Sequence, residues 1–476
     1  MRPTTALHSP RDLFLQPLAR FRTFVWMVPA GLLWLGPLIA AEGNPAAGWE
    51  QLLEQGWFSQ ARQAADTEAA RRAVAEAVSA VDEANRGRTA WLEQTDRWRL
   101  VWDRPEAGIT SSQTDRLVAL GSQHGLHLVR LATGQPVWGD GPRGGGPLFP
   151  RLRPAMQSTP FRPGRPGPVT IAASRLVGLV DRPLAGSGLG PLLAVLDLAP
   201  AAEGRLAWTY ELPSALPLPA AGLAATASAC FVAWPDPATG TLELISLAAA
   251  DGGLRWRRSW PLAAGFEKHL KSPVLVASVQ HLVVVALPGG ELVALTADTG
   301  NECWRVTLPA MTAAAASEGV IDALATTADA LVVLRRPTAG GPGLPEINRL
   351  SLLSGNASAV CRPTVVGLVT ATDEPAFGLP LLRGGHVLWP VSRSPAEPAG
   401  WLLVCRLPVK DSANDAPAPV LTAVCRLTEI IPKTPAEPPA ADRAAGSRQL
   451  VVNAGEGLWC LEPAVEEPDT VQSDPS

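Results

Sequence analysis

A glycine followed four residues later by a tryptophan occurs four times in this chain, each time just after an alternating apolar segment. Trp256 lies 48 residues from Trp208 on one side and 48 residues from Trp304 on the other. The four pairs are Gly134/Trp138, Gly204/Trp208, Gly252/Trp256 and Gly300/Trp304. A signature that recurs at a fixed period of this length indicates one supersecondary unit used several times, such as a propeller blade or a helical repeat.

The residues around these pairs indicate strands. The clearest unit, residues 281–308, contains an apolar strand, a Gly-Gly turn, a second strand, an Asp-Thr-Gly turn and a third strand. Alternating apolar runs bounded by such turns are typical of β-hairpins. Six fainter copies begin near positions 116, 175, 230, 331, 387 and 450. We therefore predict an all-β fold, a seven-bladed β-propeller of four-stranded antiparallel blades.

The two ends of the repeat region complement each other. The last unit stops after two strands, and an unpaired Trp-rich strand (97–102, RWRLVW) precedes the first unit. A propeller that pairs these two segments leaves no open sheet edge, so we predict velcro closure. Eight blades stay an alternative, because 70 residues separate Trp138 from Trp208. We interpret the Gly/Pro/Arg-rich stretch between them as a long loop. The propeller would occupy residues 96–464, with an acidic disordered tail at 465–476.

The first 41 residues differ from the rest of the chain. Arginines precede the uncharged run 23–41 (TFVWMVPAGLLWLGPLIAA), and Glu42 follows it. A positive flank, an apolar stretch and small residues at its end indicate a signal peptide. The run is also long enough for a membrane anchor, or for a buried core helix. In the first two cases the charge asymmetry places the remainder across the membrane, in the periplasm or cell envelope.

Residues 42–95 carry a helical pattern. Apolar stripes at helical spacing run through this segment, which is rich in Ala, Glu, Arg and Gln. Between them, residues 56–61 (GWFSQA) resemble the helix-turn of a tetratricopeptide repeat. No second copy is found, and a helical array needs several. We therefore expect a helical hairpin packed on the following domain.

Composition excludes some functions. The net charge of −4 gives no basic footprint for nucleic acid. The run 255–258 (RWRR) is a basic aromatic segment, but strand alternation would bury Trp256 and leave Arg255 and Arg257 in solvent. The six cysteines form no C-x-x-C pair. Cys405 and Cys425 flank a long loop and are interpreted as buried thiols or as a disulfide.

The segment 294–304 (ALTADTGNECW) resembles the tryptophan-docking motif of pyrroloquinoline-quinone-type (quinoprotein-type) propeller repeats. Ala294 is the first residue of this motif, Thr299-Gly300 the sixth and seventh, and Trp304 the eleventh. Glycine closes a tight turn at low steric cost, and a tryptophan packs flat over a peptide. We expect Gly134, Trp138, Gly204, Trp208, Gly252, Trp256, Ala294, Gly300, Trp304 and Trp102 to dock blade on blade. In the fifth repeat, Ala359 and Cys361 stand near the missing tryptophan.

The resemblance also implies a catalytic set to look for. Quinone dehydrogenases of this kind carry an adjacent Cys-Cys pair, which this chain lacks. They also place Glu, Asn and Asp around Ca²⁺, and the candidates here are Asp298, Asn301, Asn356, Asn453 and Glu456. The first three lie in predicted turns, where Asp and Asn are common.

No other constellation indicates catalysis. His124 and His127 are three residues apart on a strand-like segment, which places them on opposite faces and argues against shared metal ligation. We therefore expect no catalytic residues, no metal and no cofactor, with pyrroloquinoline quinone and calcium as the alternative.

We predict an exported, non-catalytic propeller that binds proteins through its loops, with a possible membrane tether at 23–41 and no nucleic acid partner. This role is similar to that of the propeller lipoprotein of outer-membrane assembly, although the lipid-bearing cysteine is missing. One alternative is a quinone-dependent oxidoreductase with its cofactor in the central funnel. Another is a relative of a larger repeat protein, with residues 45–86 as a remnant helical domain.

Overall fold

A computed structural model provides the structure of the chain. It separates residues 1–38 from a compact unit, Ile39–Ser476, and everything below concerns that second unit. The structure describes residues 48–89, 91–95, 98–104, 110–114, 116–122, 125–137, 167–183, 189–198, 206–213, 220–262, 274–287, 290–309, 320–327, 330–336, 346–361, 376–377, 380–383, 385–392, 401–407, 420–426, 431–432, 448–453 and 458–463. The signal or anchor run 23–41 and the tail 465–476 lie outside these residues. Within them, no helix is long and apolar enough to cross a membrane.

Four helices precede the first strand. They are α1 (Trp49–Glu54), α2 (Phe58–Ala64), α3 (Glu68–Thr89) and α4 (Trp91–Gln94). The chain turns between α1 and α2 at Gly56, whose φ of 74° is left-handed and suits a residue without Cβ. Small side chains let the first three helices pack closely around Ala61, Ala65, Ala70, Val74 and Val78, which are all buried.

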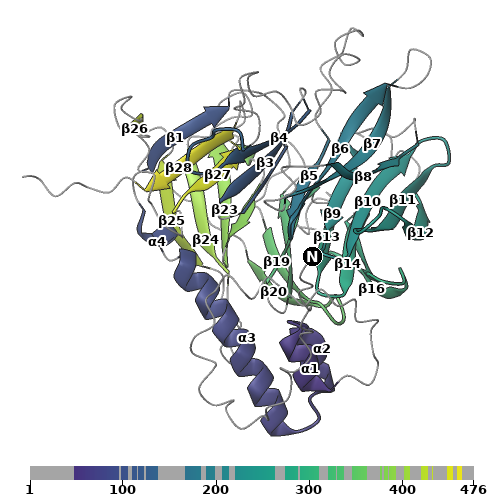
Figure 1. The fold of residues 1–476 in the computed structure, drawn as a ribbon. Coiled ribbons are helices and arrows are strands. Elements are labelled where there is room, and N and C mark those ends of the chain that lie inside the picture. The colour runs from purple at the N-terminus through teal and green to yellow at the C-terminus, as the bar shows by residue number, and fades with distance from the viewer. Residues whose placement is uncertain are drawn as a thin grey trace, which may run out of the picture. The chain divides into compact units, whose positions relative to one another are not determined.

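The remaining elements are strands, and the described ones form seven sheets, which we call blades 1 to 7 (Figure 1). Blade 1 is β2 (Thr110–Gln113), β3 (Leu117–Ser122) and β4 (Gly125–Arg130). Blade 2 is β5 (Val169–Ala172), β6 (Arg175–Pro183), β7 (Leu189–Asp197) and β8 (Leu206–Glu211). Blade 3 is β9 (Gly222–Ala225), β10 (Ala229–Asp236), β11 (Thr241–Ala248) and β12 (Leu254–Pro261). Blade 4 is β13 (Val276–Val279), β14 (Leu282–Leu287), β15 (Glu291–Thr296) and β16 (Glu302–Thr307).

The later blades are less uniform. Blade 5 is β17 (Val320–Thr326), β18 (Ala330–Arg336), β19 (Glu346–Ser351) and β20 (Ala357–Cys361). Blade 6 is β21 (Ala376–Phe377), β22 (Leu381–Arg383), β23 (His386–Ser392), β24 (Trp401–Arg406) and β25 (Val420–Arg426). Blade 7 is β26 (Ile431–Pro432), β27 (Leu450–Asn453), β28 (Leu458–Pro463) and the N-terminal strand β1 (Trp98–Arg104).

Blade 7 joins the two ends of the strand region. β1 pairs antiparallel with β28, so that Trp98 lies opposite Pro463 and Arg104 opposite Leu458. The predicted all-β propeller with velcro closure is therefore confirmed. The outer edge of β1 also pairs in parallel with the short strand β26.

Seven apolar clusters join successive blades. Val118 of blade 1 packs with Val451 of blade 7, Ala119 of blade 1 with Leu176 of blade 2, and each following pair of blades shares a cluster of its own. Blades 1 and 2 pack directly against each other, although a long stretch of sequence separates β4 from β5. The middle strands are buried on both faces, as in β11, where six of the eight residues are buried. This burial explains why the middle strands are nearly continuous apolar runs.

The strand register decides one open question about the cysteines. Cys405 of β24 lies opposite Leu421 of β25, and Cys425 lies opposite Leu402. The disulfide considered for Cys405 and Cys425 is wrong, because the two cysteines do not face each other across the pair of strands. Cys405 is a buried thiol.

Candidate functional site

The glycines of the repeat lie in turns of one geometry. Gly134, Gly252, Gly300 and Gly355 each close the turn that follows the third strand of a blade, with φ between 66° and 77°. In each turn the glycine N–H donates to the carbonyl four residues earlier, at 2.8–2.9 Å. A residue with a Cβ is strained in this left-handed conformation. The turn is therefore specified by local chemistry, as the sequence indicates.

Each docking tryptophan lies over the glycine of the following blade. A Cβ built on Gly300 would lie 2.7 Å from Cδ2 of Trp256, and one on Gly355 would lie 2.5 Å from Cε3 of Trp304. The same geometry joins Trp102 to Gly134 and Trp208 to Gly252. Each Gly-x-x-x-Trp motif that the structure describes in full therefore takes part in two joints. Its glycine lies under the tryptophan of the preceding blade, and its tryptophan lies over the glycine of the following blade.

The indole N–H completes the joint. Trp102, Trp208, Trp256 and Trp304 donate to the carbonyls of Leu131, Ala249, Ala297 and Leu352 at 2.7–2.9 Å. Each acceptor stands three residues before the docked glycine. A buried indole N–H without a partner would be costly, so this hydrogen bond fixes which side of the ring faces the turn.

The other predicted docking residues fall into two groups. Ala294 is fully buried in β15 and lies opposite Trp304. Trp138 and Gly204 lie outside the described residues.

A β-bulge marks the tryptophan position even where the tryptophan is missing. In blade 4 the pairing skips Cys303 between Glu302 and Trp304, and blades 2, 3 and 7 skip one residue at the same place. Blades 5 and 6 have the same bulge, with Ala359 and Ala423 at the register position of the tryptophan. The structure thus assigns the missing fifth tryptophan to Ala359 rather than to Cys361.

Two arginines on the outer strand of blade 3 bind the turn of blade 4 that contains Gly300. Arg255 forms an ion pair with Asp298 at 2.8 Å, and Arg258 donates to the carbonyl of Gly300 at 2.6 Å. Arg258 also reaches Asn301 Oδ1 at 3.3 Å. The expectation that Arg255 is simply solvated was therefore incomplete. Arg258 was missed, because strand alternation says nothing about a long side chain that bridges to the next blade.

The calcium candidates do not converge. Asp298 and Asn301 lie in the blade 4 turn and are bonded to blade 3, and Asn356 lies in the corresponding turn of blade 5. Asn453 ends β27 of blade 7, and Glu456 lies outside the described residues. In the described part of the chain, no three His, Cys, Asp or Glu side chains gather as metal ligands do. The candidate residues that the structure describes therefore do not fit a quinone–calcium site.

The innermost strands of blades 3 and 4 carry mostly small side chains. β9 reads GLAA and β13 reads VASV, and a Cβ on Gly222 would lie 2.0 Å from the carbonyl oxygen of Val274. Their polar groups bond the neighbouring blade, as when Ser278 donates to the carbonyl of Ala225 at 3.2 Å. These side chains fill space and join blades.

The histidine pair is not brought together in the described residues. His127 lies in β4 opposite Leu120, and His124 lies outside the described residues.

A comparison with sequence families agrees with this architecture. Residues 242–341 match the sequence family described as "Outer membrane protein assembly factor BamB". These residues are propeller repeats of the pyrroloquinoline-quinone-like type. No curated protein matches the sequence of the chain.

Solved structures of propellers are similar at low identity. BamB from Moraxella catarrhalis is 14% identical, with a TM-score of 0.39, over 74% of this chain and 83% of that one. A quinohemoprotein alcohol dehydrogenase from Pseudomonas putida HK5 is 11% identical, with a TM-score of 0.37, over 68% and 56%. The propeller domain of Cps50 (Swd1) from Myceliophteria thermophila is 11% identical, with a TM-score of 0.43, over 77% and 100%.

Blade 5 of this pyrroloquinoline-quinone-like propeller contains a buried ion pair that sequence reasoning missed. Arg335 Nη1 lies 3.5 Å from Glu346 Oε2, and both side chains are less than 5% exposed. Burial lowers the pKa of Arg335, and the charge of Glu346 opposes this shift. Asn348, two residues after Glu346 and on the same face, is also buried. The available signal was an arginine near the end of one apolar strand, β18, and a glutamate at the start of the next, β19.

The glycine–tryptophan joint predicts a difference between two substitutions. Gly240 and Gly300 have φ values of 66° and 68°, but a Cβ on Gly240 meets nothing within 4 Å. Gly240→Ala should lower the free energy of unfolding by about 1 kcal/mol, the cost of left-handed strain. Gly300→Ala should lower it by about 3 kcal/mol, because displacing Trp256 adds an overpacking cost. Urea unfolding of both variants measures the difference, and equal losses would show that the indole contact contributes nothing.

The buried ion pair predicts non-additive substitutions. Glu346→Leu should lower the free energy of unfolding by about 3–5 kcal/mol, because it leaves the Arg335 guanidinium buried without its partner. Adding Arg335→Met should recover most of this loss, since two apolar side chains then replace two charges. Denaturant unfolding of the wild type, both single variants and the double variant gives the coupling, and an additive result contradicts it.

Proposed function

We propose that this chain is an exported, non-catalytic propeller that binds proteins and serves assembly in the cell envelope. The observation that carries the proposal is the match of residues 242–341 to a family described as an outer membrane assembly factor. The matched residues extend from β11 to β18 and include one complete joint, Trp256/Gly300, with Gly252 and Trp304 from the two neighbouring joints.

The use of polar side chains supports binding over chemistry. The acidic and amide residues of the blade 4 turn, Asp298 and Asn301, are bonded to arginines of blade 3. On the outer strands, Arg257 is paired with Glu243, and Arg305 with Glu291 and Glu302. These polar groups join strands and blades, and propellers of this kind carry function on their surfaces.

The outer strands of blades 2 and 3 offer a surface for a protein partner. Leu206 and Leu254 begin β8 and β12 at the same register position, and they are 44% and 54% exposed. Blade 4 has Glu302 at this position. Exposed leucines on neighbouring blades, where another blade has a charge, favour contact with a partner.

The proposed surface is tested by giving blades 2 and 3 the residue that blade 4 already has. The double variant Leu206→Glu, Leu254→Glu should keep its unfolding midpoint, because blade 4 tolerates Glu302 at this position. It should capture at least about tenfold less of the partner recovered by the wild type from an envelope fraction, about 1.4 kcal/mol of binding. Leu353→Glu, at another exposed leucine in the turn of blade 5, is the matched control.

Two results would contradict the proposed function. One is equal capture by all variants, or no specific partner for the wild type. The other is dye reduction with alcohols or sugars by protein reconstituted with pyrroloquinoline quinone and Ca²⁺, which would favour the oxidoreductase alternative.

Export is tested separately. A chain lacking residues 1–41 should remain in the cytoplasm of a bacterial host, whereas the full chain should appear in the envelope or periplasmic fraction. Equal distribution of the two chains would contradict export.

A further inference from the structure

The helical segment is attached to the propeller at two places of very different chemistry. At its C-terminal end, Trp91 and Leu92 of α4 are buried in the apolar cluster shared by blades 6 and 7. Trp91 meets Trp98 of β1 edge to face, with ring centroids 5.8 Å apart. From this attachment α3 runs 22 residues, about 33 Å at 1.5 Å per residue, to the α1–α2 hairpin.

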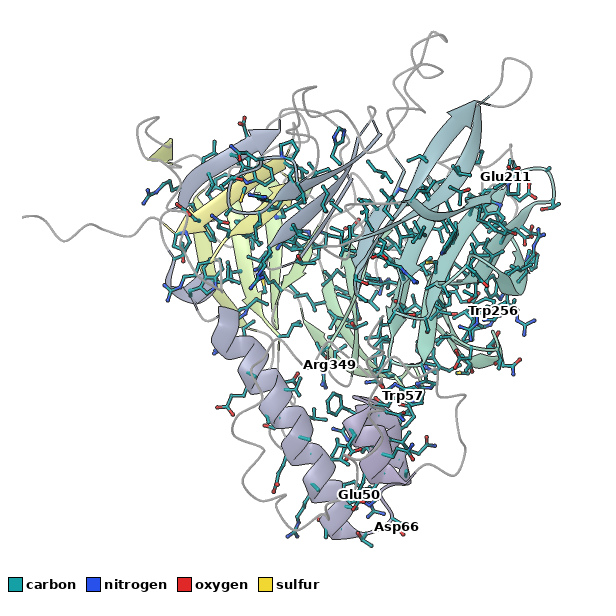
Figure 2. All side chains as sticks on the ribbon, viewed as in Figure 1. Glu50, Trp57, Asp66, Glu211, Trp256 and Arg349 are labelled. Atoms are coloured by element: carbon teal, nitrogen blue, oxygen red, sulfur yellow. The ribbon has the colours of Figure 1, made fainter. Side chains whose placement is uncertain are left out.

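The hairpin makes its own contact with blade 4. The ring of Trp57 lies 5.6 Å from the imidazole of His281, tilted by 36°, and the side-chain amide of Gln60 lies against the nitrogens of the same imidazole. Figure 2 shows Trp57 at the end of the hairpin that faces the strands. These contacts join residues more than 200 positions apart.

His281 stands at a position where the repeat uses a backbone carbonyl. In five blades the carbonyl of the residue between the first two strands accepts a hydrogen bond at 2.7–2.9 Å from the end of the third strand. That residue is Arg116, Ser174, Ser228, His281 and Gly385 in blades 1, 2, 3, 4 and 6. Blade 4 thus presents an imidazole where the other four present unrelated side chains. The preceding residue, Gln280, has a φ of 53°, which tightens the turn.

We infer that the α1–α2 hairpin is a pH-sensitive latch, docked on blade 4 through His281 at neutral pH and released in mild acid. The geometry favours a neutral imidazole in the docked state, because an amide N–H of Gln60 needs a ring nitrogen with a free lone pair. The ring is also half-buried between Trp57 and the turn, where a positive charge loses hydration.

The charged groups near His281 oppose this only in part. On the propeller side, Asp298 favours the protonated imidazole, but its carboxylate is held by Arg255 at 2.8 Å. On the helical side, the contacting residues Trp57 and Gln60 do not titrate. Burial outweighs Asp298 and lowers the pKa of His281 below its ordinary value.

The sign of the effect follows from this shift. A histidine whose docked pKa is depressed stabilises docking fully above its free pKa of about 6.5, and this contribution is lost as the pH falls. The docking constant should fall about tenfold for each unit between the free and docked pKa values. The apolar attachment at α4 has no titrating group of this kind and should stay intact.

Hydrogen exchange on the full chain tests the latch. We compare the protection of residues 49–64 at pH 7.5 and pH 5.5 after correction for intrinsic exchange, with residues 282–296 of blade 4 as the internal reference. Protection of 49–64 should fall several-fold in acid, while that of 282–296 stays unchanged. Gln60→Ala with Trp57→Ala should show the lower protection of the released hairpin at both pH values, which calibrates release.

Two single variants assign the effect. His281→Gln keeps an amide partner for Gln60 but does not titrate, so its protection should be the same at both pH values. His127→Gln removes a histidine in blade 1 and should keep the wild-type response. An unchanged wild type at pH 5.5 would overturn the latch, as would an equal acid response in His281→Gln. Because the readout is docking, the result is independent of any protein partner.

Discussion

The architecture depends on one contact, an indole lying over a left-handed glycine of the next blade and donating its N–H three residues upstream. Glycine is required twice at this point, by a backbone φ near +70° and by an aromatic ring that leaves no room for a Cβ. Each contact involves only one ring and one turn, yet the two residues are 32 to 51 positions apart in the sequence, from Trp102/Gly134 to Trp304/Gly355. Blades that would be marginal alone therefore become one continuous core.

Two of the later blades lack the docking tryptophan and are joined in another way. Blades 5 and 6 keep the bulge at the docking position but place Ala359 and Ala423 there. The junctions after them rely on apolar clusters, and the junction of blades 6 and 7 includes Trp91 and Leu92 of α4. The helix enters the core at a junction where the docking tryptophan is missing, so the helical segment is part of the propeller's packing.

Polar groups in the blade 4 turn join neighbouring blades. Asp298 was a candidate metal ligand from its residue type, yet it meets Arg255 and lies near His281. The same turn of blade 4 thus contacts Trp256 and two arginines of blade 3, and it lies near the histidine that binds the helical hairpin. The family match includes blade 4, and the proposed latch docks on it.

The repeat by itself determined the class of fold, the strand order within a blade and the closure of β1 on β28, because these follow from periodicity, turn chemistry and leftover strands. It did not indicate which turn receives each tryptophan, that Arg258 contacts the next blade, that Arg335 pairs with Glu346 inside blade 5, or that His281 contacts the helices. Most of these contacts join residues far apart in the sequence, and a repeat pattern read along the chain does not predict which distant side chains meet. The sequence also predicted that these residues dock blade on blade, but only the tertiary structure decided that the tryptophan of one repeat lies over the glycine of the next, because closing the ring brings these two residues together.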